Sequence, residues 1–119
     1  MPAASTPAHL CAYLVLCGER PLLGGMAFDL QGVNEVVLGR GGPLAASALG
    51  SGRARIDVPD GTMSGDHARL APAADGTATI EDLGSRNGTT VNGTKITGAV
   101  PVESGAVIRI GRTTLELRG

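Results

Sequence analysis

The sequence predicts an all-β domain, a sandwich or barrel of about ten short strands, and two observations support that prediction. Glycine occupies 19 of the 119 positions and proline seven, a composition typical of frequent turns. Between the turns lie short apolar or β-branched runs, and no stretch has a helical period of useful length. Short strands separated by turns every 8–12 residues or so are typical of β-sandwiches and β-barrels.

The first half of the chain opens with a segment unlike the rest. Residues 1–9 are rich in Pro, Ala, Ser and Thr, so we expect a disordered segment there and a domain over residues 10–119. The stretch from Gly39 to Gly52 is rich in glycine and alanine and is expected to be a long loop, and Pro59-Asp60-Gly61 predicts a turn. The strands expected in this half are Leu10–Leu16, Met26–Leu30, Glu35–Leu38, Arg53–Val58 and His67–Ala71.

The second half shows the alternation of half-buried strands most clearly. Apolar and polar residues alternate on both sides of Gly111-Arg112, which predicts a hairpin with its turn at that dipeptide. A turn is also expected at Ala74-Asp75-Gly76. The strands expected here are Thr77–Leu83, Thr89–Val91, Thr94–Ile96, Val100–Val102, Ala106–Ile110 and Thr113–Arg118.

The dipeptide Asn-Gly, a strong signal for a tight hairpin turn, occurs twice, at 87–88 and 92–93. Two hairpins so close together would leave an implausibly short strand between them. The copy at Asn92-Gly93 is flanked by β-branched runs on both sides, Thr-Thr-Val and Thr-Lys-Ile, and is expected to be the hairpin turn. The copy at Asn87-Gly88 is then expected to belong to a loop.

Composition argues against several classes of function. The net charge is -1 and aromatic residues make up 2% of the chain, so neither the charge nor the stacking groups of a nucleic-acid-binding protein are present. The single lysine is Lys95, and no phosphate-binding loop of the nucleotide type occurs. No apolar run reaches the ~18 residues of a membrane span.

Catalytic and metal-binding patterns are also missing. Residues 64–67 contain Ser, Asp and His, but adjacency in sequence is not the geometry of a catalytic triad. Two cysteines and two histidines without close spacing do not predict a metal site, and no cofactor is expected. Cys11 and Cys17 lie in one apolar run, and if that run is extended they are too far apart to bond to each other, which favours a reduced, cytoplasmic compartment. We therefore expect a protein without enzymatic activity.

Polar residues gather instead in three loops of the expected sandwich. Gly39-Arg40 ends a strand, Ser64-x-x-His67 leads into another, and Gly84 to Thr89 follows a third, within the run Asp-Leu-Gly-Ser-x-Asn-Gly-Thr at residues 82–89. Together with Val-Asn-Gly at 91–93, this order of motifs closely resembles the forkhead-associated (FHA) domain, a phosphothreonine-peptide-binding β-sandwich of about eleven strands. The resemblance covers nearly the whole chain, from about Leu10 to Arg118.

The resemblance implies a set of binding residues on these loops. Arg40 and Ser64 would bind the phosphate, Arg86 would line the same pocket, and Asn87 would hydrogen-bond the backbone of the bound peptide. Guanidinium groups suit this task because they offer planar, charge-assisted donors to a dianionic phosphate. Structural roles are expected for the remaining motif residues, which are Gly39, His67, Gly88, Asn92 and Gly93.

The chain departs from the family pattern at Gly65-Asp66, where family members commonly carry a basic residue between the Ser and the His. A carboxylate near the phosphate would weaken binding, so we expect Asp66 to lower the affinity. Three further arginines are expected to be surface charges, one of which could rim the pocket: Arg53, Arg55 and Arg69.

The resemblance also implies a biological setting. We expect a phosphothreonine-dependent interaction module of Ser/Thr-kinase signalling within a larger protein, and the lead-in at residues 18–22 resembles FHA modules of bacterial sigma-54-type transcriptional regulators. Its partner would be a phosphothreonine-containing protein or peptide, with no direct contact to nucleic acid or membrane. The alternative is a scaffold that assembles through the same surface without phosphate.

Overall fold

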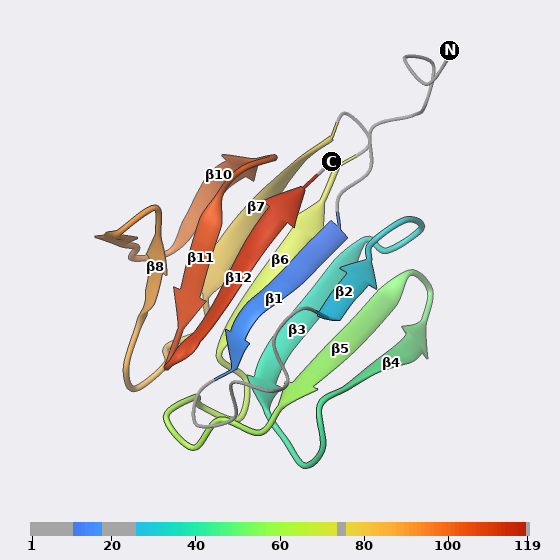
Figure 1. Ribbon diagram of the computed structural model, residues 1–119. Helices are drawn as coiled ribbons and strands as arrows, with labels where there is room; N and C mark the ends of the chain where they lie inside the picture. Colours follow the sequence, from blue (N-terminus) through green and yellow to red (C-terminus); the bar gives the residue numbers. More distant parts are fainter. Residues whose placement is uncertain (1–10, 18–25, 74–75, 119) are drawn as a thin grey trace.

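The computed structural model describes residues 11–17, 26–73 and 76–118. This part of the chain contains twelve strands and no helix, which confirms the all-β prediction (Figure 1). It therefore includes no helix that could cross a membrane. The strands are β1 (Cys11–Cys17), β2 (Met26–Asp29), β3 (Glu35–Arg40), β4 (Ala45–Gly50), β5 (Arg53–Val58), β6 (Ala68–Pro72), β7 (Thr77–Asp82), β8 (Thr89–Val91), β9 (Thr94–Lys95), β10 (Ala99–Glu103), β11 (Val107–Ile110) and β12 (Thr113–Arg118).

The strands form two six-stranded sheets that pack face to face. The first sheet has the order β2-β1-β12-β11-β8-β9, and the second has the order β10-β7-β6-β3-β5-β4. Strands β3 and β5 run parallel, because the chain between them turns back as β4 along the outer side of β5. The other strand pairs are antiparallel, and for consecutive strands such as β6–β7 and β11–β12 the short connection requires it.

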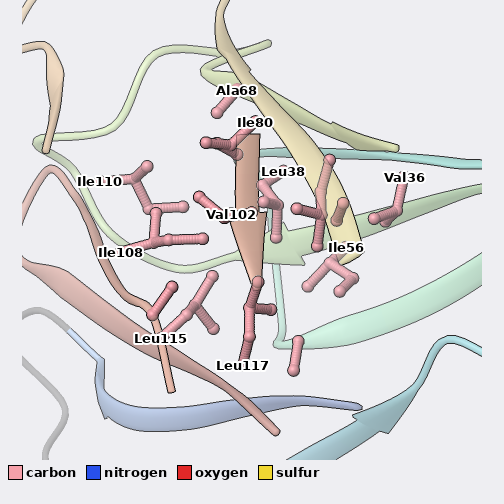
Figure 2. Close-up of a cluster of buried hydrophobic side chains, with 14 of the residues drawn as sticks. Val36, Leu38, Ile56, Ala68, Ile80, Val102, Ile108, Ile110, Leu115 and Leu117 are labelled. Carbon is pink, nitrogen blue, oxygen red and sulfur yellow. The ribbon is translucent and has the colours of Figure 1, made fainter. Parts of the chain in front are cut away.

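Aliphatic side chains from both sheets fill the space between them. In β12 the residues alternate between buried and half-buried along the strand, so one face of the sheet is covered by the core and the other meets solvent. Figure 2 shows side chains from the two sheets pointing toward one another in a single cluster. The labelled members are Ile108, Ile110, Leu115 and Leu117 of the first sheet and Val36, Leu38, Ile56, Ala68, Ile80 and Val102 of the second.

The two Asn-Gly dipeptides do different work, as predicted. Asn92 and Gly93 have φ angles of 50° and 87° and form the two-residue turn between β8 and β9, where Val91 pairs with Thr94. Positive φ at both central residues is the geometry that favours Asn-Gly in hairpins. The Asn92 side chain also accepts a hydrogen bond from the Val107 N–H at 2.9 Å, which fastens the turn to β11. Asn87-Gly88 lies in the β7–β8 loop, and of the two residues Gly88 has a positive φ, 83°, whereas Asn87 does not.

The prediction of a loop from Gly39 to Gly52 was wrong. Strand β3 continues through Gly39 and Arg40, and Ala45–Gly50 forms β4 at the edge of the second sheet. All six residues of β4 are exposed, so neither face is buried and the strand has no hydrophobic alternation to reveal it. Its backbone pairing with β5, which no sequence pattern encodes, defines it as a strand.

Several connections meet at one end of the sandwich, at the bottom of Figure 1. The main-chain N–H of Arg40, at the end of β3, donates to the Ser64 carbonyl in the β5–β6 connection at 2.9 Å. The β5–β6 connection is bonded in turn to the β7–β8 loop and to the β11–β12 turn. The outer ends of β1 and β12, where Cys11 pairs with Arg118, lie at the opposite end.

Candidate functional site

A cavity of about 350 Å³ opens among these connections. Arg40 reaches it from the end of β3, Ser64 from the β5–β6 connection, and Arg86 and Asn87 from the β7–β8 loop. The structure thus brings together all four residues to which the sequence assigned peptide binding. The other described residues of the lining are Gly61, Thr62, Met63 and Gly65, so none of the described carboxylates lines the cavity.

The two arginines of the cavity differ from most others in the chain. Among the described residues, neither the Arg40 nor the Arg86 guanidinium forms an ion pair or a hydrogen bond, and both residues are exposed. Two guanidiniums that no described carboxylate balances lie beside one cavity and attract an anion to it. The arginines held by carboxylates are Arg53 (by Glu35), Arg55 (by Asp57 and Asp66), Arg69 (by Glu81) and Arg118 (by Glu116).

Ser64 holds a hydroxyl at the cavity with a defined orientation. Its Oγ accepts a hydrogen bond from the Arg86 main-chain N–H at 3.0 Å, while its own N–H donates to His67. A hydroxyl that accepts one bond still has its hydrogen to donate. The Ser64 Oγ–H can therefore donate to an anion in the cavity, whereas the Ser64 amide is already engaged.

The Asn87 side chain forms a second link between the β7–β8 loop and the β5–β6 connection. Its Nδ2 donates to the Thr62 carbonyl at 2.6 Å. Its Oδ1 accepts no hydrogen bond from any residue in the described ranges. This oxygen is an acceptor that a bound molecule can use.

His67 is completely buried, and its ring joins the β5–β6 connection to the β7–β8 loop. Its Nδ1 accepts the Ser64 N–H at 3.1 Å, and its Nε2 lies 2.7 Å from the Gly88 carbonyl oxygen. The ring must then be the neutral tautomer that carries its proton on Nε2. Because His67 bonds to the Ser64 main chain and not to its hydroxyl, the pair lacks the geometry of a nucleophile and its base.

Asp82 organises the β7–β8 loop, a role that the sequence analysis did not assign. Its carboxylate accepts hydrogen bonds from the Ser85 hydroxyl at 2.5 Å, the Thr89 hydroxyl at 2.8 Å, and the main-chain N–H groups of Gly84 and Ser85. Burial alone would raise the pKa of Asp82, but these bonds to the charged form outweigh it and lower the pKa. The Asp-Leu-Gly-Ser spacing, in which a carboxylate can bond to amides two and three residues on, was the available signal.

Asp60 performs the same task for the β5–β6 connection, where only a turn was predicted. The side chain is 1% exposed, and it accepts bonds from Thr62, from the Arg112 N–H at 2.9 Å and from the Thr113 hydroxyl at 2.7 Å. These bonds outweigh the effect of burial, which would raise the pKa of Asp60, so the pKa is lowered. Asp60 therefore joins the connection that carries Ser64 to the β11–β12 turn.

Gly39, which precedes Arg40, is required for close packing and not for an unusual φ. A Cβ added there would lie 1.9 Å from the Gly65 carbonyl oxygen and 2.7 Å from Nη2 of Arg55. A backbone carbonyl cannot retreat from such a clash without moving the loop that it belongs to. Only glycine at position 39 lets the Ser64–Gly65 segment approach the end of β3.

The Arg55 side chain bonds to Gly65 and Asp66, the two residues at which the chain departs from the family pattern. Its Nη1 contacts the Asp66 carboxylate at 2.6 Å, its Nη2 donates to the Gly65 carbonyl at 2.6 Å, and its Nε contacts Asp57 at 2.7 Å. The charge of Asp66 is thus balanced by a guanidinium. Of the three arginines expected on the surface, Arg55 is the one that contacts the segment lining the cavity.

A larger cavity of about 560 Å³ lies elsewhere, lined among others by Val91, Asn92, Pro101 and Glu103. Glu103 is the only charged residue among its described lining, so this part of the chain places no cation there for an anionic ligand. The smaller cavity is the one with the chemistry of a binding site.

Comparison with known proteins identifies the architecture around the cavity. The FHA domain family model matches residues 36–111. This chain belongs to the FHA domain family. The sandwich extends beyond the matched residues on both sides, because β1, β2 and β12 lie outside the match and complete the first sheet of this FHA domain.

Relatives and solved structures agree with that assignment. The FHA domain-containing protein FhaB of Mycolicibacterium smegmatis is 49% identical over 61 residues, which cover 51% of this chain and 39% of FhaB. The FHA domain of CT664 from Chlamydia trachomatis has the same fold, with a TM-score of 0.74 at 22% identity over 94% of this chain and 98% of that domain. The FhaA FHA domain, solved in complex with the intracellular domain of Rv3910, has a TM-score of 0.66 at 25% identity over 92% and 99% of the two chains.

Proposed function

We propose that this FHA domain binds phosphothreonine-containing proteins and that the phosphate occupies the cavity between Arg40, Ser64 and Arg86. One observation carries the proposal. Within the described part of the chain, two guanidiniums without a carboxylate partner and one hydroxyl with a hydrogen to donate lie at a single cavity that no acidic residue lines. The cavity is therefore built to receive an anion with several acceptor oxygens.

Phosphothreonine fits that description better than a carboxylate does. It carries a charge of about -1.5 to -2 and three strong acceptor oxygens, enough for both guanidiniums and the Ser64 hydroxyl together. Charge-assisted hydrogen bonds are also roughly twice as strong as neutral ones. Membership of the FHA family supports phosphothreonine as the residue that carries the phosphate.

Asn87 supplies the part of the site that recognises a peptide. Its Nδ2 is held by the Thr62 carbonyl, and its Oδ1 accepts a main-chain N–H of the ligand beside the phosphothreonine. The amide then positions an extended peptide across the β5–β6 and β7–β8 loops. Phosphate contacts supply affinity, and this main-chain contact sets the direction of the peptide.

The domain acts as a reader of Ser/Thr-kinase signalling and not as an enzyme. The chain spans 39% of the length of FhaB, so we propose that it is the interaction module of a larger protein. Its ligands are products of a kinase, which uses intracellular ATP, and this favours a cytoplasmic location. The FhaA domain in its complex shows that a related FHA fold takes a protein as its partner.

A degenerate peptide library separates this function from phosphate-independent assembly. The domain is immobilised and offered matched libraries that carry phosphothreonine, phosphoserine or unmodified threonine at one position. We expect retention of phosphothreonine peptides with affinities near ~1 μM, about -8 kcal/mol, and loss of retention after phosphatase treatment. Equal retention of the unmodified library would overturn the proposal in favour of a phosphate-independent scaffold.

A further inference from the structure

Two basic side chains lie on the solvent face of the first sheet, one on each side of Thr90. Lys95 of β9 pairs with Thr90 of β8, and Thr90 pairs in turn with Arg109 of β11. Residues that stand opposite each other on neighbouring strands point to the same face of a sheet. Thr89, the neighbour of Thr90, is buried, so this face is the one turned to solvent. Lys95 and Arg109 therefore form a basic row across the adjacent strands β9, β8 and β11, with the Thr90 hydroxyl between them.

Both side chains of the basic row extend toward the end of the sandwich where the loops meet, at the bottom of Figure 1. A Cβ added at Gly88 would lie 2.6 Å from Cε of Lys95 and 3.3 Å from its Nζ, so the lysine side chain packs on a glycine of the β7–β8 loop. The Arg109 Nε donates to the Gly111 carbonyl in the β11–β12 turn at 3.2 Å. Both loops adjoin the 350 Å³ cavity, since the β7–β8 loop lines it and the β11–β12 turn is bonded to the β5–β6 connection that lines it.

No described carboxylate neutralises the basic row. Within the part of the chain that the structure describes, neither Lys95 nor Arg109 forms an ion pair, and both residues are exposed. A carboxylate on the same face of β12 belongs to Glu116, which stands opposite Val107. It is already held by Arg118 at 2.7 Å. The positive charge of the row is therefore available to an anion that comes from outside the domain.

We infer that the basic row binds an acidic residue that flanks the phosphothreonine in the same ligand, so that the domain prefers phosphothreonine in an acidic context. The inference rests on the proposed function, which places the peptide main chain at Asn87. Lys95 packs on Gly88, the residue next to Asn87, so the row lies directly beside the path of the peptide. An extended chain advances ~3.3 Å per residue, so a residue about two positions from the Asn87 contact reaches Lys95 with its carboxylate.

The size and chemistry of the row fit a carboxylate side chain. An ammonium, a guanidinium and a hydroxyl offer donors to the oxygens of one acidic group. A nucleic acid requires a wider basic surface and aromatic stacking groups, whereas this chain has a net charge of -1 and 2% aromatic residues. An exposed ion pair changes affinity by about fivefold at most. The row therefore selects among phosphothreonine peptides, while the phosphate contacts supply most of the affinity.

Variants of the best phosphothreonine peptide from the library test the inference. Each flanking position in turn carries Asp, Ala or Lys, and the measured quantity is the ratio of the affinities for the Asp and Ala peptides. Wild type should show a ratio of about three to five at adjacent positions on one side of the phosphothreonine, and added salt should reduce it. Lys95→Met and Arg109→Met should each lower the ratio, and Lys95→Glu should reverse the preference toward the Lys peptide. The matched control, Arg53→Met, removes an exposed positive charge outside the cavity and should keep the wild-type ratio.

The ε-methylene NMR signal of Lys95 gives a second readout that does not depend on variants, because Lys95 is the single lysine of the chain. The signal should move further on titration with the Asp peptide than with the Ala peptide. Equal affinity of wild type for the Asp and Ala peptides at every position overturns this inference and leaves the proposed function standing. A Lys95→Met domain with the wild-type ratio, or equal movement of the Lys95 signal with both peptides, has the same consequence. A folded wild type that binds no phosphothreonine peptide overturns the proposed function and this inference with it.

Discussion

The main-chain N–H of Arg86 donates a hydrogen bond to the hydroxyl oxygen of Ser64 at 3.0 Å. This bond joins the two loops that form most of the cavity, and it does so at the residue whose remaining hydroxyl hydrogen is available to a phosphate. The site is therefore held in place by its own framework before any ligand arrives. Preorganisation of this kind reduces the entropy that binding must overcome.

Replacement of His67 tests whether its ring stabilises the two loops that carry Ser64 and Gly88. His67→Ala leaves the Ser64 N–H and the Gly88 carbonyl without their buried partner, and each unsatisfied group costs roughly 1–3 kcal/mol. We expect the free energy of unfolding to fall by about 2–4 kcal/mol. Phosphopeptide affinity should also fall, because Ser64 and Gly88 are no longer tied together. Urea denaturation measures the first effect; an unchanged unfolding midpoint would show that the ring does not support the loops.

The lowered pKa of Asp60 predicts how the free energy of unfolding depends on pH. Its pKa in the folded protein is lowered, so the stability that it contributes is complete above the ordinary Asp pKa of about 3.9 and is lost as the pH falls through the lower, folded value. Asp60→Asn replaces an acceptor by a donor that faces other donors, and should cost about 2–3 kcal/mol at neutral pH.

Denaturation curves recorded from about pH 7 down to about pH 3 check this assignment. Wild type should lose stability steeply below about pH 4, and Asp60→Asn should show a shallower loss. Some acid sensitivity should remain in the variant because the pKa of Asp82 is lowered in the same way. Identical acid limbs for the two proteins would mean that Asp60 does not gain its stability from these hydrogen bonds.

The ion pair between Arg55 and Asp66 predicts that substitutions of the two residues have coupled effects on phosphopeptide affinity. Because Arg55 already balances Asp66, Asp66→Asn should change phosphopeptide affinity by no more than about twofold, roughly 0.4 kcal/mol. Arg55→Ala leaves two carboxylates unbalanced near the cavity and should weaken binding by about two- to fivefold, since a unit charge some 8 Å away is worth roughly 0.5–1 kcal/mol. Titrations at low and high salt measure both changes.

The double variant Arg55→Ala/Asp66→Asn provides the control for that pair. It should recover part of the affinity lost in Arg55→Ala, and added salt should reduce every difference because the Debye length is near 8 Å at physiological strength. Asp66→Asn alone could instead tighten binding as much as the removal of an unbalanced carboxylate would. That result would show that the ion pair with Arg55 does not neutralise the charge of Asp66 in solution.

Local chemistry made much of this fold predictable. The dipeptide Asn92-Gly93 between two β-branched runs predicted a hairpin turn, which the positive φ angles confirm, and the alternation in Thr113–Arg118 predicted a strand with one buried face. Strand β4 escaped prediction because pairing alone defines it. Its residues are small and exposed on both faces, so no period of two appears in the sequence.

The residues of the candidate site were predictable from the sequence to a similar extent. Arg40, Ser64, Arg86 and Asn87 could be named from the order of their motifs, and the structure places all four at one cavity. The bonds that hold them there join residues far apart in sequence. Asp60 reaches Thr113 across 53 positions, and Arg55 reaches Asp66 only because β5 is parallel to β3 and brings its guanidinium beside the β5–β6 connection. Contacts of this kind depend on the pairing of strands, which sequence patterns do not specify.

Calorimetric titration of wild type and Arg40→Ala with the best phosphothreonine peptide from the library tests the central claim most directly. The matched control is Arg53→Ala, which removes an arginine of the same sheet that is paired with Glu35 and lies outside the cavity. We predict that Arg40→Ala weakens binding at least about tenfold, because a hydrogen bond to a charged group contributes roughly 1.5–3 kcal/mol, with little change in melting temperature. Arg53→Ala should stay within about twofold of wild type, because exposed ion pairs contribute little. An Arg40→Ala domain that binds the peptide as tightly as Arg53→Ala does would contradict the assignment of this cavity to the phosphate.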